Sequence, residues 1–85
     1  MSNHAHESHP QIMARLKRAH GHLAKVIAML EGQAPCSDVA QQLFAVEKAV
    51  TNAKRALIHD HIEHCLSSDD DGSGIEDFKA ITKYL

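Results

Sequence analysis

The sequence predicts an all-α fold of three helices, two of them long and the third short and C-terminal. Apolar residues recur at steps of three and four along two long segments, which is the period of an amphipathic helix. Both prolines, Pro10 and Pro35, stand where a helix would begin, and no segment alternates as a strand would. We therefore expect one helical domain over residues 10–85, preceded by a flexible histidine-rich tail over residues 1–9.

The first helix is predicted from Pro10 to Glu31. Its apolar residues keep helical spacing throughout: Ile12, Leu16, Ala19, Leu23, Val26, Ile27 and Leu30. Gly32 is a typical helix stop, so Gly32–Pro35 is predicted to be a short turn. The polar tail before this helix has no period and contains His4, His6 and His9.

The second helix is predicted to begin at Cys36 or Ser37 and to continue to about Leu66. A heptad-like seam runs along it: Val39, Leu43, Val46, Val50, Ala53 and Leu57. A second apolar flank lies beside the seam: Ala40, Phe44, Ile58, Ile62 and Leu66. A helix of roughly 30 residues is about 45 Å long, and one short chain cannot cover both flanks over that length. The sequence therefore predicts self-association as an antiparallel helical-bundle dimer.

An acidic linker rich in Gly and Ser, Ser67–Gly74, is predicted to precede the short third helix, whose apolar residues begin at Ile75. The linker does not fit the calcium-loop template. Placing Gly72 at its sixth position puts Ser67 at the first ligand position and Phe78 at the last, and neither is a carboxylate. We therefore expect a linker and no cation site.

The composition limits the function classes. Nine Lys and Arg against eleven Asp and Glu give a net charge of -2, so any DNA contact must use a local basic patch. Two cysteines are too few for a disulfide framework, and neither a signal peptide nor a membrane-spanning stretch is evident, so we expect a cytoplasmic protein without a membrane partner. Without a Gly-rich phosphate loop we expect neither an enzyme nor a small-molecule substrate. Eight histidines indicate metal or proton chemistry instead.

The segment His59–Cys65 carries the clearest metal-ligand pattern. His61 and Cys65 are four residues apart, so they share one face of a helix and can bind one ion. Cys36 is a third candidate ligand, but the helix between it and His61 is about 37 Å long within one chain. If two copies of the second helix pack antiparallel, Cys36 of one copy lies beside His61 and Cys65 of the other, which gives two equivalent sites.

A fourth ligand is available from the tail, at His4, His6 or His9, and His64 is a further candidate beside Cys65. Sulfur and nitrogen donors of this kind suit Cu(I), Zn(II), Ni(II) or Co(II) and exclude Mg(II) and Ca(II). The extra nitrogen donors of the tail favour Ni(II) or Co(II), because these ions take more ligands than a trigonal Cu(I) site.

Four parts of the chain together resemble a known family: Ile12–His22, Cys36, Gln41–Leu43 and His61–Cys65. The resemblance is to the CsoR/RcnR family of metal-sensing transcriptional repressors and covers almost the whole chain. The family's ligand pattern falls on His4, Cys36, His61 and Cys65, as in the nickel- and cobalt-responsive members of the InrS and DmeR kind. The resemblance implies a dimer of dimers that binds operator DNA without a helix-turn-helix. It also implies that the metal weakens this binding, so that a metal exporter is expressed.

Basic residues of the first helix are the candidate DNA contacts. Arg15, Arg18, His22 and Lys25 fall at steps of three and four along one side of it. Four further residues are predicted to extend this surface: Lys17, Lys48, Lys54 and Arg55. A tetramer repeats the patch fourfold, which supplies enough phosphate contacts for salt-dependent binding. One departure is Glu47–Lys48, which stands where many family members have an Arg-Gly pair.

Three other functions stay open. A Cu(I)-responsive repressor would use Cys36, His61 and Cys65 alone, and loss of His4 would not affect it. A persulfide or redox sensor would join Cys36 to Cys65 across the dimer and would not need His61. A metal-buffering protein would have no DNA partner.

Overall fold

The computed structural model describes residues 8–67 and 73–85, and within them the prediction of an all-helical fold is confirmed. The helices are α1 (His9–Glu31), α2 (Cys36–Ser67) and α3 (Ser73–Thr82). Helix α1 begins one residue before the predicted start, because Ser8 is its N-cap residue and Pro10 fits in the first turn. His9, predicted to be the last residue of the tail, is therefore the first helical residue.

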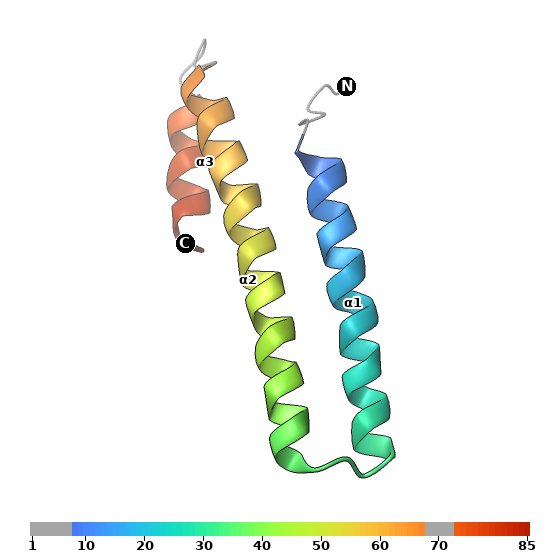
Figure 1. Ribbon diagram of the computed structural model, residues 1–85. Helices are drawn as coiled ribbons and strands as arrows, with labels where there is room; N and C mark the ends of the chain where they lie inside the picture. Colours follow the sequence, from blue (N-terminus) through green and yellow to red (C-terminus); the bar gives the residue numbers. More distant parts are fainter. Residues whose placement is uncertain (1–7, 68–72) are drawn as a thin grey trace.

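Helices α1 and α2 form an antiparallel hairpin (Figure 1). Each contributes a row of buried residues seven apart to the seam between them. The α1 row is Ile12, Ala19 and Val26, and the α2 row is Val39, Val46 and Ala53. Residues seven apart lie almost directly above one another on a helix, so the two rows meet along the length of the hairpin. Met29 and Ala34 extend this core at the closed end.

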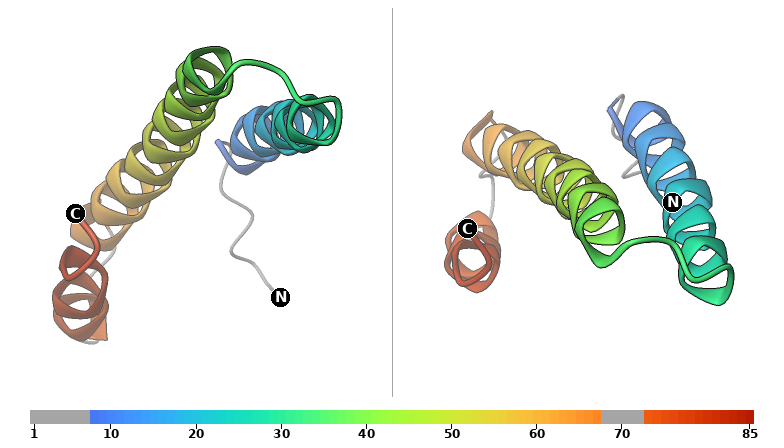
Figure 2. Two further views of the ribbon diagram at one scale, coloured as in Figure 1. Left: turned by 90° about the horizontal axis from the view of Figure 1, so that it is seen from below. Right: turned by 60° about the horizontal axis from the view of Figure 1, so that its bottom comes forward.

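Helix α3 packs against α2 and runs back along it, on the side away from α1 (Figures 1 and 2). Ile58 of α2 is only 2% exposed although it lies off the seam with α1, so α3 is the element that covers it. The molecule measures 55 × 24 × 14 Å. Its thickness is close to that of a single helix with side chains, about 10–12 Å. The described chain is therefore one layer of helices with two uncovered faces.

Helix α1 ends at Glu31 with Gly32 as its C-cap, as predicted, and the turn that follows is closed by the next residue. Gly32, the expected stop, has an ordinary φ of -87°, whereas Gln33 has the left-handed φ of 60°. The Ala34 N–H donates to the Met29 carbonyl over 2.9 Å, and the Gln33 N–H donates to the Leu30 carbonyl over 3.1 Å. This is a Schellman motif with Gln in the position that usually belongs to Gly.

The predicted linker Ser67–Gly74 is shorter in the structure, since Ser67 ends α2 and Ser73 begins α3. Residues 68–72 lie outside the described part of the chain. In the part that the structure describes, no helix combines the length and apolar character that crossing a bilayer requires.

The Schellman motif generates a stability prediction. Replacing Gln33 by Gly removes the steric cost of a left-handed non-glycine residue, so Gln33→Gly should raise the free energy of unfolding by about 1 kcal/mol. The matched control is Gln41→Gly within α2, which should lower it by about 1 kcal/mol. Urea unfolding followed by circular dichroism, at one fixed protein concentration, measures both. A loss of stability in Gln33→Gly would contradict the assigned turn.

Candidate functional site

One face of the hairpin carries large apolar side chains that the chain itself does not bury. On α1 they include Leu16, Leu23 and Leu30, and on α2 they include Leu43, Val50 and Leu57. The three α2 side chains are 43%, 45% and 39% exposed. Each of the six follows a seam residue by four positions, a step that rotates a helix by about 40°. On two right-handed helices that run antiparallel, this rotation is toward the same side, so the six residues form one apolar face.

The candidate metal ligands of α2 belong to this apolar face. Cys36 is the first residue of α2 and lies seven residues before Leu43, in the same row. Its thiol is free and exposed. His61, which is half-buried, lies four residues after Leu57 at the other end of the row. Cys65 is helical and one turn beyond His61. The row of exposed apolar residues therefore has a thiol at one end and an imidazole at the other.

A single chain does not bring these ligands together. Cys36 and His61 stand at opposite ends of the hairpin, separated by about 37 Å of helix. Among the described residues, no group of three or more His, Cys, Asp or Glu side chains is placed to hold a metal ion. A site that uses both Cys36 and His61 requires a second copy of α2.

The open end of the hairpin holds two further candidate ligands, His9 and His64. His9 at the start of α1 lies at the same end of the molecule as His61 and His64 near the end of α2 (Figure 1). His9 is half-buried and His64 is exposed. His4 and His6 lie outside the described residues.

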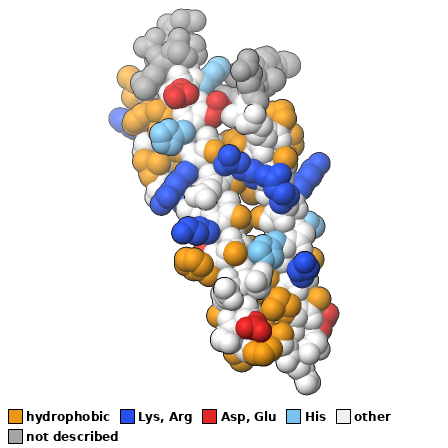
Figure 3. Space-filling model, in the orientation of Figure 1, with side chains coloured by type: hydrophobic (Ala, Val, Ile, Leu, Met, Phe, Trp, Pro, Cys, Tyr) orange, Lys and Arg blue, Asp and Glu red, His pale blue; other side chains and the backbone are white. Residues whose placement is uncertain are grey.

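Four of the five predicted DNA contacts of α1, namely Arg15, Arg18, His22 and Lys25, lie on the other face of the hairpin, which is its basic face. Arg15 and His22 each follow a seam residue by three positions, a step that rotates by about 60° in the direction opposite to the apolar face. Together with Arg18 they line one cleft between α1 and α2. Lys25, which is exposed, follows His22 by three residues and lies on the same side of α1. Figure 3 shows Lys and Arg side chains gathered across the middle of one face, over both helices.

The structure does not bring the other predicted DNA contacts to this cleft. Lys17 is two residues from Arg15, which places it on the far side of α1. Lys54 follows Val50 by four residues and therefore stands beside the apolar face. Arg55 lines a neighbouring groove along α2 with Lys48, whose Nζ lies 5.3 Å from the centroid of the Phe44 ring. This groove shares Asn52 with the cleft.

Two residues of the basic face were not predicted. The Nε2 atom of His22 lies 2.6 Å from Oε1 of Gln42, and this partly buried hydrogen bond joins α1 to α2. Asn52 of α2 lines the same cleft as His22. The sequence signal that could have identified them is a polar residue beside a seam position. Gln42 follows Val39 by three residues, and Asn52 directly precedes Ala53. The periodicity of the sequence did not show which α1 residue Gln42 or Asn52 would face.

Comparison with known proteins gives a consistent result. Residues 8–85 match the family described as metal-sensitive transcriptional repressors. The copper-sensing transcriptional repressor CsoR of Mycobacterium ulcerans is 41% identical over 68 residues, which are 80% of this chain and 58% of the relative. The protein of the same name from Mycobacterium tuberculosis is 43% identical over 54 residues, 64% of this chain and 45% of the relative.

A third relative, the copper-sensing transcriptional repressor CsoR of Bacillus subtilis, is 37% identical over 57 residues, 67% of this chain and 56% of the relative. The chain thus spans about half the length of the curated relatives that it matches. No solved structure matches the chain.

The apolar face generates a prediction about assembly. Leu43→Glu places a charge in the middle of the apolar face. The lost leucine removes about 2 kcal/mol from the free energy of association, and a symmetric dimer loses this contribution twice. We expect the wild-type chain to sediment as a dimer or larger and Leu43→Glu to shift toward monomer. Ala45→Glu, at an exposed position of α2 off this face, is the matched control and should keep the wild-type mass. An unchanged mass for Leu43→Glu in analytical ultracentrifugation would contradict the assignment.

Proposed function

Since this chain belongs to the family of metal-sensitive transcriptional repressors, we propose that it is a repressor whose hold on operator DNA weakens when a transition metal binds between two copies of α2. The matched family is one of transcriptional repressors and not of enzymes, which agrees with the expectation from the sequence that this protein is not an enzyme. The observation that carries the proposal is the row of exposed apolar residues along α2, with Cys36 at one end and His61 at the other.

Antiparallel pairing of this row with itself supports an inter-subunit metal site. Leu43, Val50 and Leu57 are covered by the second copy, and Cys36 of each copy is carried to the His61 end of the other. Cys65, one helical turn after His61, completes a set of two thiolates and one imidazole. When bound, the metal joins two chains through these three side chains, so its binding is coupled to how the two hairpins are placed.

The three ligands of α2 favour one inducing metal, and the histidines of the tail favour another. Two thiolates and an imidazole suit Cu(I), and the relatives named above are copper sensors. Ni(II) or Co(II) is the second candidate, because His4, His6 or His9 would add nitrogen donors to the same site. His64 is an alternative nitrogen donor beside Cys65, and Zn(II) is compatible with any of these sets.

The opposite face supports operator binding. Arg15, Arg18 and His22 lie together on the side of the hairpin that an apolar interface leaves uncovered. A dimer of dimers presents this face four times, so that phosphate contacts accumulate in spite of a net charge of -2. The metal and the DNA then occupy different faces, and each lowers the affinity for the other through the arrangement of the chains. Such a repressor acts in the cytoplasm.

A dithiol sensor is a second candidate, favoured by the exposed free thiol of Cys36. In that case a persulfide donor oxidises Cys36 and Cys65 to an inter-subunit bridge, and His61 takes no part.

The proposal predicts a metal-dependent release of DNA. DNA from upstream of the protein's own coding sequence is followed by fluorescence anisotropy, while reduced protein is titrated anaerobically with Cu(I), Ni(II), Co(II) or Zn(II). One of these metals should weaken DNA binding by roughly 5- to 150-fold, the usual range of allosteric coupling. Cys36→Ala and His61→Ala should each abolish the release, and His20→Ala, an exposed histidine outside the ligand set, should not.

The same titration separates the candidates. Loss of the Ni(II) or Co(II) response in His4→Ala supports the site with a tail ligand, and an unchanged Cu(I) response in that variant supports the three-ligand site. Release by a persulfide donor and by no metal, with His61→Ala still responding, would reject the metal sensor in favour of the dithiol sensor.

A further inference from the structure

A carboxylate continues the buried row that α2 contributes to the seam. The row consists of Val39, Val46 and Ala53. Asp60 follows Ala53 by seven residues, so it stands in the same row. Asp60 is half-buried, and its Oδ2 atom is buried. Because burying a carboxylate is costly unless positive charge faces it, this position of the seam requires a positive group on the facing element.

The facing element is the start of α1. The two helices are antiparallel, so Ile12, the first buried residue of the α1 row, is opposite Ala53, the last buried residue of the α2 row. Asp60 stands about 10 Å further along α2, beyond the level of Ile12. Side chains on a helix lean toward its N-terminus, so the carboxylate of Asp60 leans back toward the first turn of α1. Figure 1 shows the start of α1 and the end of α2 at the same end of the molecule.

The start of α1 supplies positive charge, because the N-terminus of a helix carries a positive partial charge. Among the described residues, the first turn of α1 contains no acidic side chain, and its N-cap Ser8 makes no side-chain capping hydrogen bond. The Oγ atom of Ser8 is itself buried. The carboxylate of Asp60 is therefore placed to supply, from the neighbouring helix, the negative charge that a capping side chain supplies in other helices.

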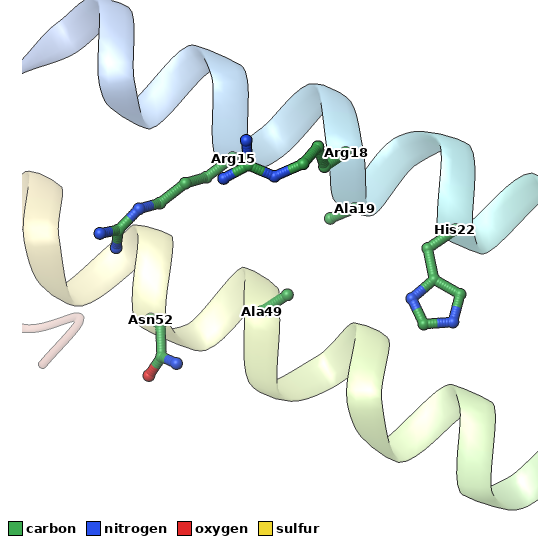
Figure 4. Close-up of a pocket in the computed structure, with 6 residues that line it drawn as sticks. All are labelled: Arg15, Arg18, Ala19, His22, Ala49 and Asn52. Carbon is green, nitrogen blue, oxygen red and sulfur yellow. The ribbon is translucent and has the colours of Figure 1, made fainter.

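Asp60 also lies between the candidate metal ligand and the candidate DNA contacts. It directly precedes His61, and adjacent helical residues point about 100° apart. One turn of α2 thus presents His61 to the apolar face and Asp60 to the seam. On α1, Arg15 and Arg18 enter the cleft within three turns of the start of the helix (Figure 4).

We propose that Asp60 is the positioning residue that transmits metal binding from His61 to α1. In the metal-free protein its carboxylate stabilises the first turn of α1 and fixes α1 against α2. Binding of a metal to His61 across the dimer draws the last turns of α2 toward the partner, moves the carboxylate away from the start of α1, and displaces Arg15 and Arg18 from the positions that suit DNA. This inference rests on the proposed function and deepens it, because it names the contact whose two arrangements couple the metal to the DNA.

The first test examines this contact in the metal-free, full-length protein. Asp60→Asn removes the charge and keeps the shape, so the first turn of α1 should open more often. Hydrogen exchange followed by NMR reports this opening at Ile12, whose N–H donates to the Ser8 carbonyl over 2.9 Å. Exchange at Ile12 should become roughly fivefold faster, the effect of one charge at a helix N-terminus. Val39, whose N–H donates to the Pro35 carbonyl at the start of α2, is the internal control and should not change.

The second test measures the coupling. For each variant, fluorescence anisotropy gives the ratio of DNA affinities without and with saturating metal, using the metal that releases DNA from the wild-type protein. Asp60→Asn should lower this ratio roughly fivefold, while the thiolate absorption of its metal complex keeps the wild-type intensity. Asp60→Glu keeps the charge and should restore most of the ratio. Glu63→Gln removes the same charge from an exposed position of α2 and should keep the wild-type ratio.

The outcomes separate this inference from the proposed function. Unchanged exchange at Ile12 in Asp60→Asn would overturn the role of Asp60 and leave the repressor intact. Equal effects of Asp60→Asn and Glu63→Gln on the ratio would overturn it in the same way, since they would show a general effect of charge. A wild-type protein whose DNA binding no metal changes would reject the proposed function and, with it, transmission through Asp60.

Discussion

The seam between α1 and α2 is the interaction on which the rest of the structure depends, and it is built from small side chains. Its rows of Ile, Val and Ala allow two helices to approach closely but bury little apolar surface. The larger leucines stand beside the seam, where no described part of the chain buries them. A single layer of helices is not a complete core, and the second layer that we propose is the apolar face of another copy.

The two faces of the hairpin follow from one geometric rule. A step of four from a seam residue leads to the apolar face, as at Leu43 or Val50, and a step of three leads to the basic face, as at Arg15 or His22. The candidate metal ligands Cys36 and His61 lie on the first of these faces. In the proposed dimer, the covering of the apolar face and the assembly of the metal site are the same event, while the cleft faces away from it. Under the proposed function, metal and DNA bind to separate faces and influence each other only through the arrangement of the chains.

Periodicity and caps predicted the helices and the turn, because these depend on local preferences that a sequence displays directly. Gly32 was predicted to stop α1 and is its C-cap, but the left-handed residue of the turn is Gln33, because the hydrogen bonds to Met29 and Leu30 fix the geometry there. The heptad row of α2 was predicted as one seam, yet Val46 is buried and Val50 is exposed. The spacing of apolar residues does not determine which of them pack against α1 and which stay exposed. For the same reason neither Asn52 nor the cleft was foreseen, because a cleft exists only once two helices are placed together.

The shared metal site is tested most directly by metal binding in a mixture of two variants, each of which lacks one of the two thiols. Cys36→Ala and Cys65→Ala should each fail to retain Cu(I) against a competing chelator, with Ni(II) measured in parallel. After subunit exchange, half of the dimers contain both chains and each of these has one complete set of ligands, so roughly a quarter of the wild-type sites should return. Recovery of that size would establish that Cys36 of one chain acts with Cys65 of another. No recovery in a mixture shown by mass spectrometry to have exchanged subunits would contradict the shared site.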